Sequence, residues 1–375
     1  MTRRISKMLI VLLLSACLTG CWDREYLKDL HLAYTAGFDL TEDGMIKETT
    51  ELIIPPESEQ STTKNEVHSS VGFTPRSASD NLRTKVRGNI RFNKNGFVII
   101  GKPLAQKGIS PIMDVNFRDP SNPTSTVRLI ITDTNSSDLF EPKMVGELKL
   151  GEFINDKIKS LEQMSVFFPA ETVDTVFRAM MDPGQDFAVP FLSKEGDNII
   201  AKGVALFHDE YYSGMLDYEK SVMLVLLKGK KGNNARITKR VDTETGQKDR
   251  GTITINVGRK RIKRKFDVKV NDKGEVEVDL KLNLQAVVEE YTGGRKLDEP
   301  EIKKINQDLS EMLTKDAETV LHEIQKANSD VLGVGRKLIA YHNKEWKTMN
   351  WSEDYRKVRF RPQVEVNIVD TGILQ

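Results

Sequence analysis

The chain has 375 residues, of which 38% are hydrophobic and 30% charged, and its 56 Lys and Arg side chains nearly balance its 55 Asp and Glu side chains. This composition is typical of soluble, packed domains and excludes a collagen-like, low-complexity or polytopic membrane chain. The formal net charge of +1 argues against a dedicated nucleic-acid binder, and at about 100 to 200 residues per domain the length predicts two or three domains.

The amino terminus predicts a lipoprotein signal peptide over residues 1–20. Three basic residues precede an apolar run over 8–18, which is shorter than the roughly 20 residues that a membrane-spanning helix needs. Small residues then stand before a thiol, so cleavage between Gly20 and Cys21 would leave a cysteine that can be acylated. Cleavage before Cys17 would leave an apolar region of only about seven residues, near the lower limit for a signal peptide. A plain secretory signal with a chance cysteine is the alternative.

Cleavage before Cys21 determines the chemistry of the mature chain. Because Cys17 is removed and Cys21 becomes a thioether, no disulfide can form. Stable anchoring takes more than one acyl chain, and a diacylated cysteine supplies that. The rest of the chain has no second apolar stretch of spanning length. The sequence therefore predicts a globular body tethered to the outer face of a membrane.

Residues 21–190 are predicted to form an N-terminal α+β domain with a mixed sheet and helices on it. Turn-forming residues at 41–44 separate two strand-like runs, and Pro55-Pro56 ends the second of them. The polar segment 57–70 is expected to be a loop. Further elements are expected as strands at 97–100 and 126–132 and as helices at 77–87, 151–164 and 171–181.

Residues 191–250 are predicted to form a small strand-rich middle domain. Apolar runs at 199–207, 211–216 and 221–227 are expected to be its strands. The basic, glycine-containing stretch 228–240 is expected to be a linker or loop.

Residues 251–375 are predicted to form a C-terminal α+β domain in which helices pack on a long-stranded antiparallel sheet. Every second residue from Val276 to Val288 is apolar, which indicates a strand of about 40 Å with one buried face. The turn 271–274 joins it to an alternating segment upstream. Asp298 is expected to begin a long helix, Ser329-Asp330 to cap a second one, and Pro362 to place the last strand, 358–368, at an edge or bulge.

The catalytic and metal motifs that we searched for are absent from the sequence. The five histidines are isolated, with no HExxH or CxxC pattern, and no GxSxG elbow occurs. Residues 39–44 resemble the first half of a calcium loop, but position twelve is Thr50 rather than Glu. Gly333-Val334-Gly335 lacks the remainder of a phosphate loop. We therefore predict no metal, no cofactor and no enzymatic activity.

A run of six basic residues within seven is the strongest charge feature. It is compatible with a solvated edge strand protected against aggregation, with contact to anionic lipid headgroups, or with an acidic partner protein. Its members are Arg259, Lys260, Arg261, Lys263, Arg264 and Lys265.

Several segments, taken in order, resemble one family of proteins. Cys21-Trp22-Asp23-Arg24 directly after a lipobox, followed by a hairpin that ends in Pro55-Pro56, resembles the start of the Ger(x)C spore-germination lipoproteins, the C subunits of nutrient germinant receptors. The further matching segments are 101–109 leading to the Arg118-Asp119-Pro120 element, the strand 203–207, the helix start 329–335, and the closing segments 346–351 and 364–366. The resemblance extends over essentially the whole mature chain.

The resemblance implies a non-enzymatic accessory subunit on the outer face of the inner spore membrane. It would work with two integral-membrane subunits, A and B, and would have three α+β domains. Only Cys21 carries a firm functional role over from the family. Gly108 and Gly203 are expected where a side chain has no room, Asp330 as a helix cap, Trp346 and Trp351 as core or interface anchors, and Trp22 at the headgroup level.

Three hypotheses about function follow. The first is a lipid-held scaffold subunit that binds the A and B subunits and contributes to nutrient-triggered germination. The second is a solute-binding lipoprotein that captures the germinant itself, although such proteins usually have two α/β lobes around a cleft. The third is a cell-envelope hydrolase with an unfamiliar site.

Overall fold

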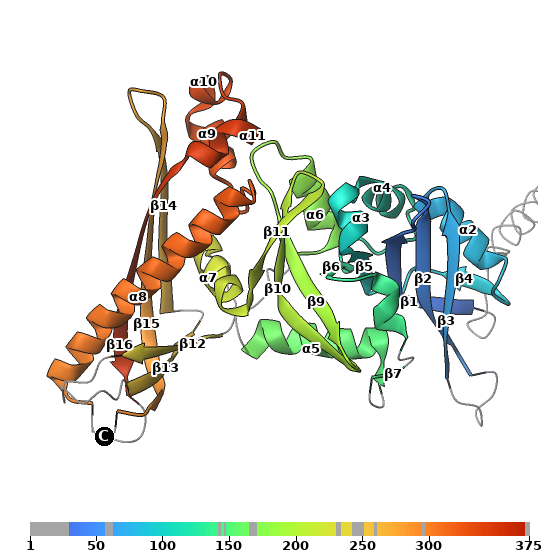
Figure 1. The fold of residues 1–375 in the computed structure, drawn as a ribbon, viewed down its shortest axis with the longest axis horizontal. Coiled ribbons are helices and arrows are strands. Elements are labelled where there is room, and N and C mark those ends of the chain that lie inside the picture. The colour runs from blue at the N-terminus through green and yellow to red at the C-terminus, as the bar shows by residue number, and fades with distance from the viewer. Residues whose placement is uncertain are drawn as a thin grey trace, which may run out of the picture.

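The computed structural model describes residues 30–56, 63–141, 144–145, 148–164, 171–229, 234–241, 251–258, 261–293 and 297–371. A nine-stranded mixed sheet extends from the right side to the centre of Figure 1, and a five-stranded sheet with a long helix stands at the left. The predicted α+β class, with a mixed sheet first and a helix-covered, mainly antiparallel sheet last, is confirmed. The last sheet departs from the prediction at one pair, because β16 lies parallel to β15.

The large sheet has a parallel centre flanked by two antiparallel strand groups. Its order is β11-β10-β9-β6-β5-β1-β2-β3, with β4 paired to β1. The neighbours from β9 to β1 are parallel, whereas β1-β2-β3 and β9-β10-β11 are antiparallel. The strands are β1 (Leu30–Leu40), β2 (Ile46–Ile54), β3 (Lys64–Gly72), β4 (Asn89–Arg91), β5 (Phe97–Gly101), β6 (Arg128–Thr132), β9 (Ala188–Glu195), β10 (Asn198–His208) and β11 (Tyr211–Asp217); β7 (Met144–Val145) and β8 (Leu148–Lys149) form a separate pair.

Helices cover both faces of this sheet, which explains why β5 is buried along its whole length. Ile99 and Ile130 pack on the face that carries α5, whereas Val98 and Ile131 pack on the opposite face. The helices of the two faces are η2 (Ser136–Phe140) and α5 (Leu150–Met164) on the first, and α3 (Lys102–Lys107), α4 (Ser110–Arg118) and α6 (Val173–Met180) on the second.

Buried carboxylates attach other elements to the sheet. Asp39 accepts hydrogen bonds from the backbone N–H groups of Ser136 and Ser137 at the start of η2. Glu51 does the same for Leu150 and Gly151 at the start of α5, at 2.9 Å each. A carboxylate at a helix N-terminus satisfies free N–H donors and complements the helix dipole. Asp39 is therefore a capping residue here.

Glu48 is a further fully buried acid of this sheet. Its two carboxyl oxygens accept hydrogen bonds from the hydroxyl groups of Thr50, at 2.9 Å, and of Ser79. Ser79 belongs to α2 (Pro75–Arg83), which packs along β3. Burial raises the pKa of Glu48 to about 7, although both hydroxyl groups and the more distant Arg83 and Arg76 oppose the shift.

The helix α7 (Tyr218–Lys228) connects the two halves of the core. All seven residues of 221–227 are buried, and the six apolar ones, 222–227, belong to one hydrophobic cluster that continues from the large sheet to the small one. The prediction of a strand at 221–227 was wrong, because the apolar run 222–227 has no periodicity that separates a buried helix from a strand. The capping signals were present, since Asp217 accepts from the N–H of Lys220 and Gly229 ends the helix at a φ of 65°.

The second sheet is built around β15, a strand of 16 residues. Even-numbered side chains from Val276 to Val288 are buried, as the alternation predicted. The sheet has the order β12-β13-β15-β14, and β16 pairs with β15 in parallel. Its elements are β12 (Asn234–Val241), β13 (Gly251–Gly258), β14 (Ile262–Val270), β15 (Val276–Tyr291) and β16 (Arg359–Asp370), covered by α8 (Glu299–Lys326).

The helix α8 protects the outer edge of β16. Asn306, Ser310 and Thr314 accept hydrogen bonds from the backbone N–H groups of Ile368, Val366 and Val364, at 2.9 to 3.0 Å. The three acceptors follow one another every four residues along the helix, a rise of about 6.0 Å, and the three donors every two residues along the strand, a rise of about 6.6 Å. The spacing of the acceptors therefore matches that of the donors. The prediction that the last strand lies at an edge is confirmed, and the helix satisfies donors that an open edge would expose.

The remaining helices form a small cluster beside the start of β15. They are α9 (Val334–Tyr341), α10 (Asn343–Trp346), α11 (Trp351–Asp354) and η4 (Tyr355–Lys357). Trp346 and Trp351 pack against this cluster with their ring centroids 5.5 Å apart. Tyr355 is fully buried between the cluster and the end of α8.

Three further predictions about elements need correction. The polar segment expected as a loop contains β3, whose Ser69 and Ser70 hydroxyl groups bond to Thr49 and to the carbonyl of Ala78 instead of to water. The expected linker contains β12, which pairs along its length with β13. The helix expected at 77–87 is α2, which begins two residues earlier because Thr74 caps it and Pro75 occupies its first turn.

The predicted boundaries at 190 and 250 remain predictions. Strand β9 continues across residue 190, and β10 and β11 complete the large sheet.

Candidate functional site

The described residues include only part of the predicted site. Gly20, Cys21, Trp22, Arg259 and Lys260 lie outside them. The other basic residues stand just before and in the first half of β14: Arg261, Lys263, Arg264 and Lys265.

The basic run does not form one continuous patch, because β14 turns its side chains alternately to two faces. Arg264 points toward the helix-covered side, with its guanidinium 4.3 Å from the ring centroid of Phe266. Burial lowers the pKa of Arg264 to about 10. Lys263 and Lys265 are exposed on the opposite face.

That opposite face carries charges of both signs. Lys265 pairs with Asp267 at 2.9 Å, and Lys269 pairs with Asp279 at 2.7 Å. Arg361 on β16 pairs with Glu277 at 3.0 Å. Of the three readings of the basic run, this mixture favours the solvated, charge-protected strand.

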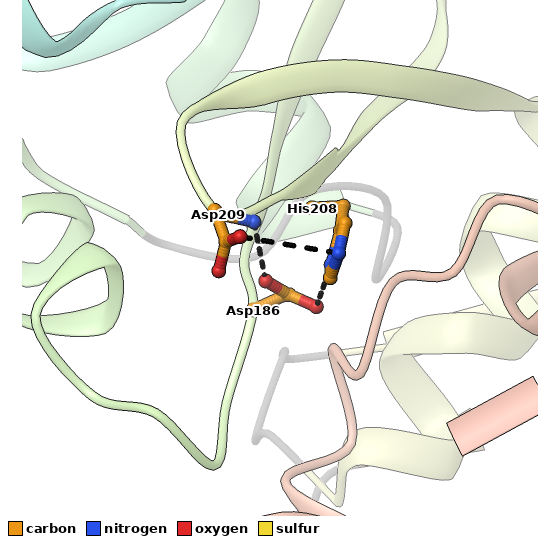
Figure 2. A group of neighbouring side chains, drawn as sticks. All are labelled: Asp186, His208 and Asp209. Atoms are coloured by element: carbon orange, nitrogen blue, oxygen red, sulfur yellow. Dashed lines mark hydrogen bonds and ion pairs between the residues drawn. The ribbon is translucent and has the colours of Figure 1, made fainter. Parts of the chain in front are cut away.

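The most connected polar group lies where the two halves of the molecule meet, and we call it the junction cluster. Asp186 accepts hydrogen bonds from the N–H of Asp209 at 2.8 Å and from the N–H of Asp330 at 2.7 Å. The N–H of Asp186 in turn donates to the carbonyl of Asp330 at 3.0 Å. The cluster consists of Asp186, His208, Asp209, Asn328, Asp330 and Trp351, of which Figure 2 shows the first three.

Asp330 organises the C-terminal side of the junction cluster. Its carboxylate accepts from the N–H groups of Val334 and Gly335 at 2.9 and 2.8 Å, and from the indole N–H of Trp351 at 3.1 Å. Asp330 therefore caps α9, as predicted. Burial, reinforced by the neighbouring carboxylate of Asp186, raises the pKa of Asp330 to about 7 against the effect of these donors.

His208 joins both sides of the junction. Its Nδ1 lies 3.5 Å from the Asp186 carboxylate, and its Nε2 lies 3.1 Å from the side-chain nitrogen of Asn328. The same Asn328 nitrogen donates to the carbonyl of Ser352 at 2.7 Å. The hydrogen bond to Asp186 raises the pKa of His208, against the opposing effect of burial.

The backbones also meet closely at this junction. A Cβ added to Gly335 would lie 2.7 Å from the Cα of Gly184, and the N–H of Arg336 donates to the carbonyl of Gly184 at 2.8 Å. Only glycine permits this approach. On the exposed side, Arg336 pairs with Asp182 at 3.0 Å.

The carboxylates and imidazole of Asp186, His208 and Asp209 could offer three ligand atoms within 4.8 Å of one another. Both oxygens of Asp186 are already engaged by backbone N–H donors. The arrangement therefore serves to hold two chain segments together.

Sequence reasoning found one partner of the junction and missed the other. Asp330 and Trp351 stand in segments singled out by the resemblance, whereas Asp186 and His208 received no role. Asp186 follows the residues Asp182-Pro183-Gly184. It stands 144 positions before Asp330 in the sequence, so no local pattern connects the two.

The predicted lack of room is confirmed at Gly203, whereas Gly108 is favoured as glycine mainly by its backbone conformation. A Cβ on Gly203 would lie 1.8 Å from the carbonyl oxygen of Leu216, at an irregularity in the β9–β10 pairing. A Cβ on Gly108, which has a φ of 115°, would lie 2.9 Å from the carboxylate of Glu210.

A groove lies between α7, β12 and α8. Its floor is apolar, from Val222, Met223 and Leu313, and its rim carries Glu219 and the ion pair of Lys239 with Asp316 at 2.7 Å. Two adjoining cavities of about 180 and 340 Å³ make up the groove. Among the described residues, no helix has both the length and the apolar character required to cross a bilayer.

Comparisons with known proteins agree with one another. A family model described as the spore germination protein N-terminal domain matches residues 23–194, and one described as spore germination B3/GerAC-like, C-terminal, matches residues 202–372. The chain is 24% identical to spore germination protein GerQC of Bacillus cereus, over 99% of this chain and 100% of that one. Its fold is similar to the crystal structure of the GerBC protein, with a TM-score of 0.55 and 14% identity over 89% of this chain and 96% of that one.

Proposed function

We propose, from the premise that this chain belongs to the GerAC-like family of spore germination proteins, that it is the lipid-anchored accessory subunit of a nutrient germinant receptor. In this proposal Cys21 carries the acyl chains and the body lies on the outer face of the inner spore membrane. The body binds the integral-membrane A and B subunits and catalyses no reaction. The observation that carries the proposal is the match of both domain models, in order, to a chain in which Gly20–Cys21 stands in a lipobox-like sequence before the first matched residue.

The junction cluster supports a scaffold role. Asp186 belongs to the segment matched by the N-terminal family model, and Asp330 to the segment matched by the C-terminal one. Their mutual hydrogen bonds and the common hydrophobic cluster around α7 hold the two segments in one arrangement. A body of fixed shape suits a subunit that positions its partners.

The lipid anchor is tested by a Cys21→Ala variant expressed from its own locus. We expect the protein to leave the spore membrane fraction, and receptor levels and nutrient-triggered germination to fall about tenfold, because one unacylated chain has no stable membrane anchor. Cys17→Ala is the matched control and should behave as wild type. Wild-type receptor levels and germination in the Cys21→Ala strain would contradict the proposal.

The second candidate function is direct binding of a germinant, and the groove between α7, β12 and α8 is the observation that favours it. Titration calorimetry of the purified protein against amino acids and sugars tests this function. If the groove binds, Thr238→Trp, which adds bulk at the exposed rim, should weaken binding about tenfold or more, as expected for a blocked pocket. No heat of binding with any germinant would reject this function and leave the scaffold role.

A further inference from the structure

We propose that the edge of the large sheet beside the chain's amino terminus contacts anionic lipid headgroups through the basic segment 83–94. This inference depends on the proposed anchor at Cys21 and adds a second, electrostatic contact to it. The segment runs from the end of α2 through β4 to the turn before β5.

The sequence around this segment has charges of one sign only. No Asp or Glu occurs between residues 81 and 113, although the whole chain has 55 of them. The basic residues in the same interval are Arg83, Lys85, Arg87, Arg91, Lys94, Lys102 and Lys107. Such an excess, in a chain of nearly neutral total charge, creates a local positive potential.

The fold places this segment next to the origin of the tether. Strand β4 pairs in parallel with the first residues of β1, with Asn89 opposite Leu30. Arg87 and Arg91 therefore stand close to the first described residue of the chain. Leu30 stands nine positions after Cys21, and at about 3.5 Å per residue this length of chain reaches at most about 30 Å. An acylated Cys21 would keep the basic segment near the bilayer surface.

The charged groups of this edge are accessible. Arg83, Lys85, Arg87 and Lys94 are exposed, and exposed Lys64 begins the neighbouring edge strand β3. The Lys85 ammonium donates to the carbonyl of Ser69 at 2.9 Å, which holds it against β3.

Among the residues that the structure describes, the acids of the same edge are fewer. Asp80 lies 4.0 Å from Arg83, and Glu66 lies 2.8 Å from His68. A basic excess therefore remains, and each Lys or Arg near an anionic membrane surface contributes about 1 kcal/mol.

The basic run at the start of β14 fits a lipid surface less well. It lies at the opposite end of the long axis from β1 to β3 (Figure 1). Its Arg264 is turned inward, and its exposed lysines stand among acids. We therefore assign the headgroup contact to residues 83–94.

The experiment uses the acylated protein purified from membranes and placed in lipid nanodiscs. One preparation contains phosphatidylcholine alone, and the other contains a quarter of phosphatidylglycerol. Lysines are modified with a water-soluble amine reagent, and their rates are read by peptide mass spectrometry. We expect Lys64, Lys85 and Lys94 to react about threefold more slowly in the anionic discs, and raised salt to remove the difference. Lys263 and Lys265 serve as internal controls and should react equally in both.

Two variants sharpen the result. Arg87→Glu should reduce the protection of Lys85 and Lys94, whereas the matched reversal Lys265→Glu on β14 should leave it unchanged. Equal reactivity of Lys85 and Lys94 in both discs would overturn the inference, and so would protection of Lys263 and Lys265 instead. Protection that appears only after the A and B subunits are added would identify an acidic protein surface rather than lipid. Failure to associate with either disc would refute the anchor itself.

Discussion

An Asp330→Ala variant should have a free energy of unfolding about 4 kcal/mol lower than that of the wild type, because two buried donors and one partly buried donor lose their acceptor at once. These donors are the N–H groups of Val334 and Gly335 and the indole of Trp351. Each buried donor left without a partner costs about 1 to 3 kcal/mol, and partial access of water reduces the sum. The loss also removes the cap of α9.

The measurement is urea denaturation followed by tryptophan fluorescence, together with hydrogen exchange of the amides of Val334 and Gly335. Exchange at both amides should accelerate, since their acceptor is gone. Arg336→Ala is the control at the same junction. Its exposed pairs with Asp182 and Gln185 are worth at most about 1 kcal/mol. A loss below about 1 kcal/mol in Asp330→Ala would show that the junction cluster does not hold the two segments together.

A Glu48→Gln variant should be more stable than the wild type above neutral pH, by up to about 3 kcal/mol. Burial raises the pKa of Glu48 to about 7 in the folded protein, from 4.5. At a pH below the lower of these two pKa values, Glu48 carries its proton in both the folded and the unfolded chain. Between the two values the unfolded chain loses its proton first, so the free energy of unfolding of the wild type falls as the pH rises. Above the higher value the full loss has been reached.

The glutamine amide is isosteric, and the hydroxyl groups of Ser79 and Thr50 can accept as well as donate hydrogen bonds. The variant should therefore lack the fall in stability between these pH values. Denaturation curves at about pH 5 and about pH 8 measure the difference. The exposed Glu345→Gln should follow the wild type at both. An identical pH dependence in Glu48→Gln and wild type would show that Glu48 is ionised at its buried position.

The elements that could be predicted are those whose pattern depends on local sequence. The alternation from Val276 to Val288 determines which face of β15 is buried, because successive side chains of a strand point in opposite directions. Asp298 and Pro300 mark the start of α8 for an equally local reason. The side chain of Asp298 accepts a hydrogen bond from a free backbone N–H of the first turn, and Pro300 has no N–H that would need a partner. The family resemblance predicted that Gly203 has no room for a side chain, and the structure leaves no room there for a Cβ.

The predictions that were wrong concern residues whose structure depends on their surroundings in the fold rather than on their neighbours in sequence. Residues 221–227 form a helix because they are surrounded by core on all sides, and their apolar run has no period of its own. Polar β3 is a strand because β2 supplies a hydrogen-bond partner for Ser69 and α2 supplies one for Ser70. Arg264 is turned inward because β14 alternates, although its neighbours in sequence are exposed lysines.

The sequence alone therefore determined the α+β class and the family resemblance, and it predicts the signal peptide, since each depends on residues close together in the chain. Only the tertiary structure decided the rest. It joins Asp186 to Asp330 across 144 residues and places the basic segment 83–94 beside Leu30. Hydrogen bonds and charges act over a few ångströms of space, and distance along the chain does not show which groups the fold brings within that range.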